Sequence, residues 1–371
     1  MALNPDPIVS VIIPAFNAEA FIEETLKSVL HQTCSDIEIL VVDDGSRDCT
    51  AAIIRGFADR DPRVKFFQQQ NRGVAAARNF AIQNSTGKYI APIDADDIWH
   101  PTKLEKQVAA LERAGESAAV AYSWSTSIDE KGNVFDAGPT WDLEGEVYQA
   151  LVLRNFIGNA SVPLFRRSAL QKVGFYNEAF RSRDAQGCED WDICLRCAEK
   201  FEYRVVREYL VGYRCYSQSM SYNHVSMGRS YELVMQEVKK RHPEIPAYVY
   251  RWSKSIFYLY LTHKSNVCGD LRNSLRWLLG ALREDKAVLL LPWVIRCLAT
   301  RLARLGIATS LDLFGKDSSA WQQARPVPLE APELLSYEEV VANREKLPKR
   351  LWDKVQLQRW VMITNHRSYS C

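Results

Sequence analysis

Residues 88–97 of the chain read KYIAPIDADD. The first six of them form an almost continuous apolar run that predicts a buried strand, and Asp94, Asp96 and Asp97 follow at its end. Carboxylates packed this closely repel one another and need a cation to neutralise them, and carboxylate ligands suit hard ions such as Mg²⁺ or Mn²⁺. The alternative is an acidic turn that begins the following helix, where Asp is common. This stretch alone leaves both interpretations open.

The sequence before this stretch alternates between two patterns. Apolar runs at residues 8–14, 37–42 and 64–68 predict strands, whereas residues 18–32, 50–60 and 73–82 carry apolar side chains at helical spacing. Buried strands separated by helices are typical of a parallel sheet covered on both faces, so we expect an α/β fold. Ligands bind such sheets at the carboxyl ends of the strands. The polar residues that follow the strands should therefore meet on one rim.

The pattern after residue 100 is less regular. It predicts a helix at residues 102–114, strands near 118–122, 161–165, 203–206 and 210–214, and a helix that runs from Gly187 to about Lys200. No G-x-G-x-x-G follows the first strand and no G-x-x-x-x-G-K-[ST] occurs, which argues against a dinucleotide fold and a P-loop.

Residues 226–310 have a helical and strongly basic composition. They hold 14 Lys and Arg against 6 Asp and Glu, a net charge of +8 in a chain whose total is +2. We expect a helical subdomain in which the leucines at 271, 275, 278, 279 and 282 form one stripe, with Arg272, Arg276 and Arg283 on another face. The alternative adds peripheral contact with anionic membrane lipid through this region. Residues 311–371 form a C-terminal extension with one helical pattern near 337–360.

The composition of the whole chain indicates a reducing compartment and gives no sign of a nucleic-acid partner. The N-terminus lacks the basic and apolar segments of a secretory signal, and no apolar run reaches the roughly 18 residues of a membrane span. Nine cysteines without framework spacing fit a reducing compartment. We expect a cytoplasmic protein without a nucleic-acid partner, with peripheral contact at the inner face of the membrane as the alternative.

Five motifs occur in order along the first 190 residues: VSVIIPAFN at 9–17, VVDDGS at 41–46, NRGVAAARN at 71–79, DADD at 94–97 and Glu-Asp at 189–190. Together they resemble glycosyltransferase family 2, over roughly residues 8–220. The resemblance implies the GT-A fold, a Rossmann-like, mostly parallel sheet with flanking helices, here followed by the C-terminal helical region. It implies a catalytic domain at 1–225, with a nucleotide-sugar half at about 1–100 and an acceptor half at about 101–225.

By this resemblance the rim binds a nucleoside diphosphate sugar with a divalent metal, Mn²⁺ or Mg²⁺. Phe16 would stack on the base, unless it is a core aromatic that closes the strand, and Asp44 would accept a hydrogen bond from a base N–H, which favours UDP. Asp94, Asp96 and Asp97 carry the D-x-D motif of the family, of which one or two would hold the metal and another would meet the ribose; we assign Asp96 and Asp97 to the metal, although the sequence alone does not divide these roles. The residues assigned to the nucleotide are Pro14, Phe16, Asn17, Asp43, Asp44, Arg78 and Asp94, with a solvated Arg78 as the alternative.

The family resemblance also implies an inverting reaction, a single displacement at the sugar's C1. Such a reaction needs a carboxylate that takes the proton of the acceptor hydroxyl. Asp190 matches the position of the catalytic base, and Glu189 would hold the acceptor or a loop. The alternative is that both carboxylates only complement the dipole of the helix that they begin.

Two departures from the family pattern limit what the resemblance implies. Tyr216 stands where many relatives have a histidine, so a histidine ligand is not expected, and Arg214 or Ser219 would contact phosphate instead. The Q-x-x-R-W of processive synthases occurs at residues 356–360, far from the Glu-Asp motif and without membrane spans after it. We therefore predict a non-processive, hexosyltransferase-type enzyme.

The predicted enzyme transfers a sugar to a glycan, a lipid-linked or a small-molecule acceptor in cell-envelope polysaccharide biosynthesis. The competing hypotheses are a sugar nucleotidyltransferase and a sugar-nucleotide-binding scaffold without catalysis. The nucleotidyltransferase would need a glycine-rich basic loop after the first strand, and PAFN at residues 14–17 is not one. The scaffold would show a broken base or metal motif, and both motifs are intact.

Overall fold

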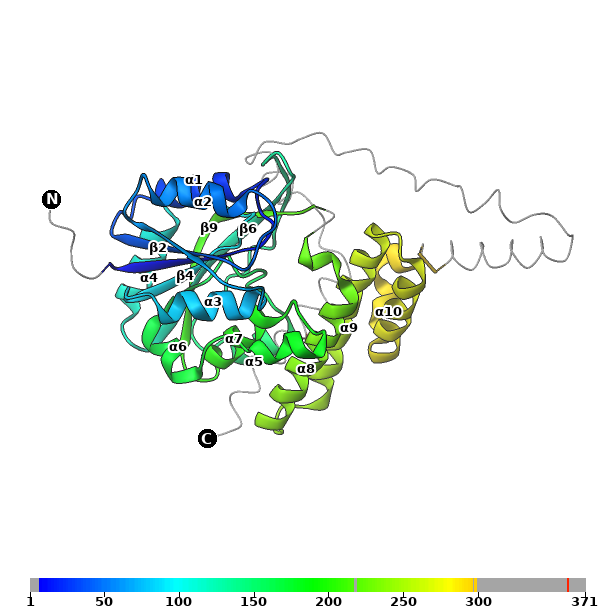
Figure 1. Cartoon of the computed structure of the whole chain (residues 1–371). Helices are drawn as coiled ribbons and strands as arrows, with labels where there is room; N and C mark the ends of the chain where they lie inside the picture. The colour runs from blue at the N-terminus through cyan, green and yellow to red at the C-terminus, as the bar shows by residue number, and fades with distance from the viewer. Residues whose placement is uncertain (1–6, 217–218, 296, 299–358, 360–371) are drawn as a thin grey trace, which may run out of the picture. The chain divides into compact units, whose positions relative to one another are not determined.

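A computed structural model describes residues 7–216, 219–295, 297–298 and 359 (Figure 1). The chain divides into two compact units, of which one runs to Arg241 and the other begins at His242. The first unit contains a nine-stranded sheet in the order β3-β2-β1-β4-β8-β6-β9-β5, and β7 pairs with β6 beside this path.

The first half of the sheet is parallel, as the sequence predicts. β1 (Val9–Ala15) pairs with β2 (Ile37–Asp43) and with β4 (Tyr89–Pro92), and β2 pairs with β3 (Val64–Gln68). α1 (Ile22–Leu30) and α2 (Thr50–Ala58) lie on one side of the sheet, and α3 (Val74–Gln83) lies on the other (Figure 1). β1 and β2 are buried along their whole length because helices cover both faces.

The second half of the sheet is mixed. β8 (Leu164–Arg166) runs antiparallel to both β4 and β6 (Ala118–Ile128), whereas β9 (Glu202–Arg214) runs parallel to β6. β5 (Ile98–Trp99) and β7 (Val134–Ala137) add antiparallel edges. The two strands predicted at 203–206 and 210–214 are one strand, because β9 pairs with β6 throughout and absorbs the irregularity as register shifts.

The remaining helices of the first unit are α4 (Lys103–Ala114), α5 (Tyr148–Leu153), α6 (Arg167–Val173), α7 (Glu189–Ala198) and α8 (His224–Arg241). Short 3₁₀ turns occupy Glu178–Arg183 and Met220–Tyr222. α8 packs against α7: the Tyr231 and Trp191 ring centroids lie 5.6 Å apart, and the Cys188 amide donates to Ser230 Oγ at 3.1 Å. α8 therefore lies in the first unit, which extends past the domain boundary predicted at residue 225.

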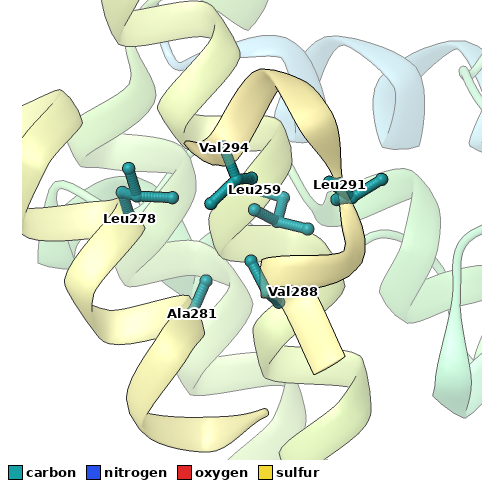
Figure 2. Close-up of a cluster of buried hydrophobic side chains, with 6 residues drawn as sticks. All are labelled: Leu259, Leu278, Ala281, Val288, Leu291 and Val294. Atoms are coloured by element: carbon teal, nitrogen blue, oxygen red, sulfur yellow. The ribbon is translucent and has the colours of Figure 1, made fainter. Parts of the chain in front are cut away.

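The second unit is helical, as predicted for its basic sequence. It contains α9 (Ala247–Val267), α10 (Leu271–Glu284) and a 3₁₀ turn at Lys286–Leu290. Its core consists of the six aliphatic side chains in Figure 2, namely Leu259, Leu278, Ala281, Val288, Leu291 and Val294. Within the described ranges, no helix has the length and apolar character that crossing a bilayer requires.

The C-terminal extension predicted at residues 311–371 lies outside the described residues, except for Arg359. The Arg359 guanidinium donates to the two carboxylate oxygens of Asp285 at 2.6 and 2.9 Å and lies 4.5 Å above the centroid of the Trp252 ring. The arginine of the Q-x-x-R-W therefore makes a structural ion pair, which agrees with our interpretation of that motif as coincidental.

Candidate active site

The carboxyl ends of β1 and β2 are joined by short hydrogen bonds. The Asp44 amide donates to the Ala15 carbonyl at 2.8 Å. The Asn17 amide donates to Ser46 Oγ at 2.9 Å, and Asn17 Oδ1 accepts from the Arg47 amide at 2.9 Å. Asn17 has a positive φ of 48°, a conformation that Asn tolerates better than most residues. The predicted meeting of these two strand ends on one rim is therefore present.

Phe16 and Pro14 differ in exposure although they lie two residues apart. Pro14 is buried within β1 opposite Val42, where it can shape the strand but presents little surface. The Phe16 side chain follows the strand end and is 49% exposed. The alternative of a core aromatic is therefore wrong, and an apolar ring is available on the rim for stacking.

Asp44 holds the loop that leads into α3. Its Oδ1 accepts from Gln69 Nε2 at 2.7 Å and from the Arg72 amide at 2.8 Å, and its Oδ2 accepts from the Gly73 amide at 2.7 Å. Asp43, which is fully buried, accepts from Gln68 Nε2 at 2.9 Å. Both carboxylates thus have structural partners, and Asp44 Oδ2 retains a lone pair for a further donor.

The acidic turn after β4 is fixed from two directions. On the α1 side, Thr25 Oγ1 donates to the Ala95 carbonyl at 3.0 Å and to the Asp97 carbonyl at 2.8 Å. From the segment before β8, Ser161 Oγ accepts from the Asp94 amide at 2.9 Å and donates to Asp97 Oδ2 at 2.5 Å. The turn therefore has a defined conformation before any ligand binds.

Arg214, at the end of β9, completes this support. Its Nε donates to the Asp96 carbonyl at 2.7 Å, and its amide donates to Asp97 Oδ1 at 2.9 Å. The rest of the guanidinium donates to the carbonyls of residues 129 and 130 at 2.9 Å and to Glu24 Oε2 at 2.6 Å. The Arg214 side chain is fully buried, so the expectation that it contacts phosphate is wrong.

The three carboxylates of the turn therefore differ in what they offer a ligand. Both oxygens of Asp97 are engaged and its side chain is buried, whereas Asp94 and Asp96 are partly exposed. Burial, followed by the charge of Asp94, raises the pKa of Asp96 to about 6, and a hydrogen bond from Tyr216 opposes this shift. Burial also raises the pKa of Asp97, with Asp96 and Asp94 as further causes.

This donor set fits a divalent cation. Mg²⁺ and similar ions are commonly held by one or two carboxylates, with water and substrate phosphate filling the other positions. Among the described residues no group of three or more acidic, histidine or cysteine side chains forms a complete cage. Asp96, with Asp94 beside it, would therefore hold such an ion together with ligand oxygens, and Asp97 would orient the turn.

Arg78 lies beside this turn and is not solvated, contrary to the alternative. Its side chain is buried, forms an ion pair with Asp94 and lies 5.1 Å from the centroid of the Tyr176 ring. Asn79 holds the backbone of Tyr176, because its Oδ1 accepts from the Tyr176 amide and its Nδ2 donates to the Tyr176 carbonyl, both at 2.9 Å. The Arg78 guanidinium therefore lies between α3 and the segment after α6.

The Glu-Asp pair begins α7, and its two carboxylates have different environments. Glu189 is buried, and its Oε2 accepts from the Gly187 amide at 2.7 Å, so it holds the loop before the helix. Asp190 is partly exposed, with Oδ1 accepting from the Trp191 amide at 2.8 Å. Burial raises the pKa of Asp190 to about 7; the Arg78 charge lowers it, and the Glu189 charge raises it.

Sequence reasoning missed three residues that this arrangement depends on. Ser161, Tyr176 and Gln69 contact the carboxylates or the arginine of the site, yet each lies in a stretch without a motif. Tyr216, which was noted for replacing a histidine, does reach Asp96. Tyr216 and Gln69 could have been found from the sequence, because each follows the end of a strand. Ser161 and Tyr176 do not follow a strand end, and no sequence signal points to them.

Comparison with known proteins identifies the class. The model of "Glycosyl transferase family 2" matches residues 10–174. The "Putative teichuronic acid biosynthesis glycosyltransferase TuaG" of Bacillus subtilis is 31% identical over 241 residues, which cover 64% of this chain and 91% of TuaG. The chain belongs to glycosyltransferase family 2 and is a glycosyltransferase.

Other similarities are partial. Chondroitin synthase of Escherichia coli is 28% identical over 238 residues, 64% of this chain but only 31% of that longer protein. The solved structure of the mannosyltransferase PcManGT from Pyrobaculum calidifontis, in complex with GDP-Man and Mn²⁺, has a TM-score of 0.52 at 17% identity. It covers 85% of this chain and 89% of PcManGT. The fold is therefore GT-A, with the C-terminal helical region added.

Replacing Arg214 with lysine should destabilise the first unit. A lysine keeps the charge but cannot donate to all the carbonyls that the planar guanidinium reaches, so buried acceptors lose their partners. We expect Arg214→Lys to lower the free energy of unfolding by about 3 kcal/mol in urea denaturation. The matched control is Arg63→Lys at an ion pair with Asp61 whose side chains are 26% and 25% exposed, and this variant should change the free energy of unfolding by less than about 0.5 kcal/mol. Equal stability of the two variants would contradict the role given to Arg214.

Proposed function

We propose that the chain is an inverting, metal-dependent, non-processive glycosyltransferase that moves a sugar from a nucleoside diphosphate sugar to an acceptor hydroxyl. One observation carries the proposal. The buried guanidinium of Arg78 is paired with Asp94 of the acidic turn and is close enough to Asp190 to lower the pKa of its carboxyl. The Arg78 guanidinium thus pairs with a carboxylate assigned to the donor and lowers the pKa of the carboxylate assigned as the base.

Asp190 is the proposed general base. In a single displacement, its carboxylate takes the proton of the acceptor hydroxyl while the acceptor oxygen bonds to C1 of the sugar. The bond from C1 to the phosphate oxygen breaks, and the nucleoside diphosphate leaves with that electron pair. A base is most effective when its pKa is close to the working pH, and burial gives Asp190 such a value.

The donor site is proposed on the rim around the acidic turn. Asp96 and Asp94 would hold the metal and the ribose or phosphate groups, with Asp97 behind them. The bound ion would supply positive charge for the departing diphosphate. Phe16 would stack on the base, and Asp44 Oδ2 would accept from a base N–H, which keeps UDP as our first choice. Asn17, Asp43 and Pro14 support this pocket through the β1 and β2 ends.

An acceptor hydroxyl of a cell-envelope polysaccharide, a lipid-linked intermediate or a small molecule would enter from residues 125–190. We propose work in the cytoplasm, since all eight cysteines within the described ranges are free thiols. Membership of the glycosyltransferase family argues against a nucleotidyltransferase, and turnover separates an enzyme from an inactive scaffold.

The first test is release of nucleoside diphosphate from a panel of UDP- and GDP-sugars with candidate acceptors and Mn²⁺. We expect turnover with one donor and a fall of about 10³-fold in Asp190→Asn, because a positioned base contributes roughly 10²–10⁴-fold. Asp184→Asn, at an exposed carboxylate near the same helix, is the control and should keep wild-type turnover. Turnover of Asp190→Asn within tenfold of wild type would exclude Asp190 as the base.

The pH dependence of turnover tests the same residue without mutation. The active form of the base is the carboxylate, so kcat/KM should rise about tenfold per pH unit below the pKa and level off above it, with a midpoint near pH 7. Arg78→Gln should move the midpoint to higher pH, since the guanidinium favours the charged carboxylate. A profile that is flat between pH 5 and 8 would contradict the assignment.

A further inference from the structure

α10 presents an unusual face to solvent. Its buried face consists of Ser274, Trp277, Leu278 and Ala281. On the rest of the helix, Leu271 and Leu279 are 51% and 53% exposed. The predicted apolar stripe is therefore divided: Leu278 enters the core, whereas these two leucines lie in solvent on the helix that also carries the arginines. Packing in the core therefore does not explain why positions 271 and 279 carry leucine.

The arginines of this face lack acidic partners. Arg272, Arg276 and Arg283 are exposed, and none has an ion pair with any residue that the structure describes. The nearby acids are engaged elsewhere: Glu284 lies 3.7 Å from Arg251 and 3.8 Å from Lys254. Asp285 binds Arg359, and Asp270 accepts from the Asn273 amide as the cap of α10. The face therefore carries uncompensated positive charge.

The three arginines also line a groove between α9 and α10 that has a volume of about 540 Å³. Arg272, Arg276 and Arg283 surround it, together with Leu275, Leu279 and Tyr258. Gly280 lets the Tyr258 ring approach the helix, because a Cβ at that position would lie 2.6 Å from Tyr258 Cδ2. The groove thus has an aromatic wall and a cationic edge.

We propose that this face of α10 docks on an anionic phospholipid surface. The guanidinium groups would bind phosphodiester oxygens in two-point contacts, for which their planar donors are suited. Leu271 and Leu279 would enter the boundary between headgroups and acyl chains, and the helix would lie in the plane of the interface. An acidic soluble partner would account for the arginines but not for the exposed leucines beside them. The inference does not depend on the catalytic proposal.

The test is sedimentation of the full chain with vesicles of phosphatidylcholine that contain or lack phosphatidylglycerol. We expect binding only to the anionic vesicles, and weaker binding as salt rises, because the screening length falls from about 10 Å at 0.1 M to 3 Å at 1 M. The triple variant Arg272→Gln/Arg276→Gln/Arg283→Gln should bind on the order of 100-fold more weakly. Leu271→Gln/Leu279→Gln should also bind more weakly, with the salt dependence retained.

The control variant Arg113→Gln/Lys131→Gln/Lys200→Gln removes the same charge from exposed positions of the first unit and should bind like wild type. Thermal unfolding of each variant establishes that it is folded. Equal loss in the control and in the α10 variant would show a net-charge effect and overturn the site. Absence of vesicle binding by the wild type, or self-association that the α10 variant abolishes without any vesicle binding, would overturn the lipid as occupant.

Discussion

The end of β4 must hold three carboxylates within four residues against their mutual repulsion. The structure meets this constraint with neutral donors and two buried arginines. Ser161 and the amide of Arg214 bind Asp97, and Arg78 pairs with Asp94. Asp96 receives a single hydroxyl, from Tyr216, and the pKa of its carboxyl stays raised. Arg78 thus offsets the charge of Asp94, whereas the pKa values of Asp96 and Asp97 both stay raised, and a cation bound at Asp96 would reduce the remaining repulsion.

Arg78 also influences the carboxylate of Asp190 at the start of α7. Arg78 forms an ion pair with Asp94 and lowers the pKa of Asp190 through space, so the pKa of the proposed base depends on the residues beside the acidic turn. The Arg78 guanidinium packs against the Tyr176 ring. The side-chain oxygen and nitrogen of Asn79 in turn bind the backbone of Tyr176. A substitution in the segment after α6 would therefore change the pKa of the proposed base, although that segment does not contact Asp190 through a carboxylate of its own.

Local pattern predicted the elements whose neighbours are close in sequence. β1, β2 and β3 follow from apolar runs, and β3 has the predicted bounds at Val64 and Gln68. The contacts that support the site escape this reasoning because they are distant: Arg214 and Asp96 lie 118 residues apart. From sequence alone, an arginine at the end of a strand is expected to face solvent or to bind phosphate. The tertiary structure shows that Arg214 instead donates to carbonyls that are distant in sequence. The contacts of α8 are also distant in sequence, since Ser230 and Tyr231 bind residues at the start of α7.

The acidic turn is proposed to bind a diphosphate through a cation at Asp96. Calorimetric titration of UDP and GDP into the protein, with Mn²⁺ and with a chelator, tests it most directly. One nucleotide should bind at least tenfold more tightly with Mn²⁺, and Asp96→Asn should lose that gain while Asp59→Asn, at an exposed helix end, keeps it. Metal-independent binding by the wild type, or an unchanged Mn²⁺ effect in Asp96→Asn, would contradict the claim.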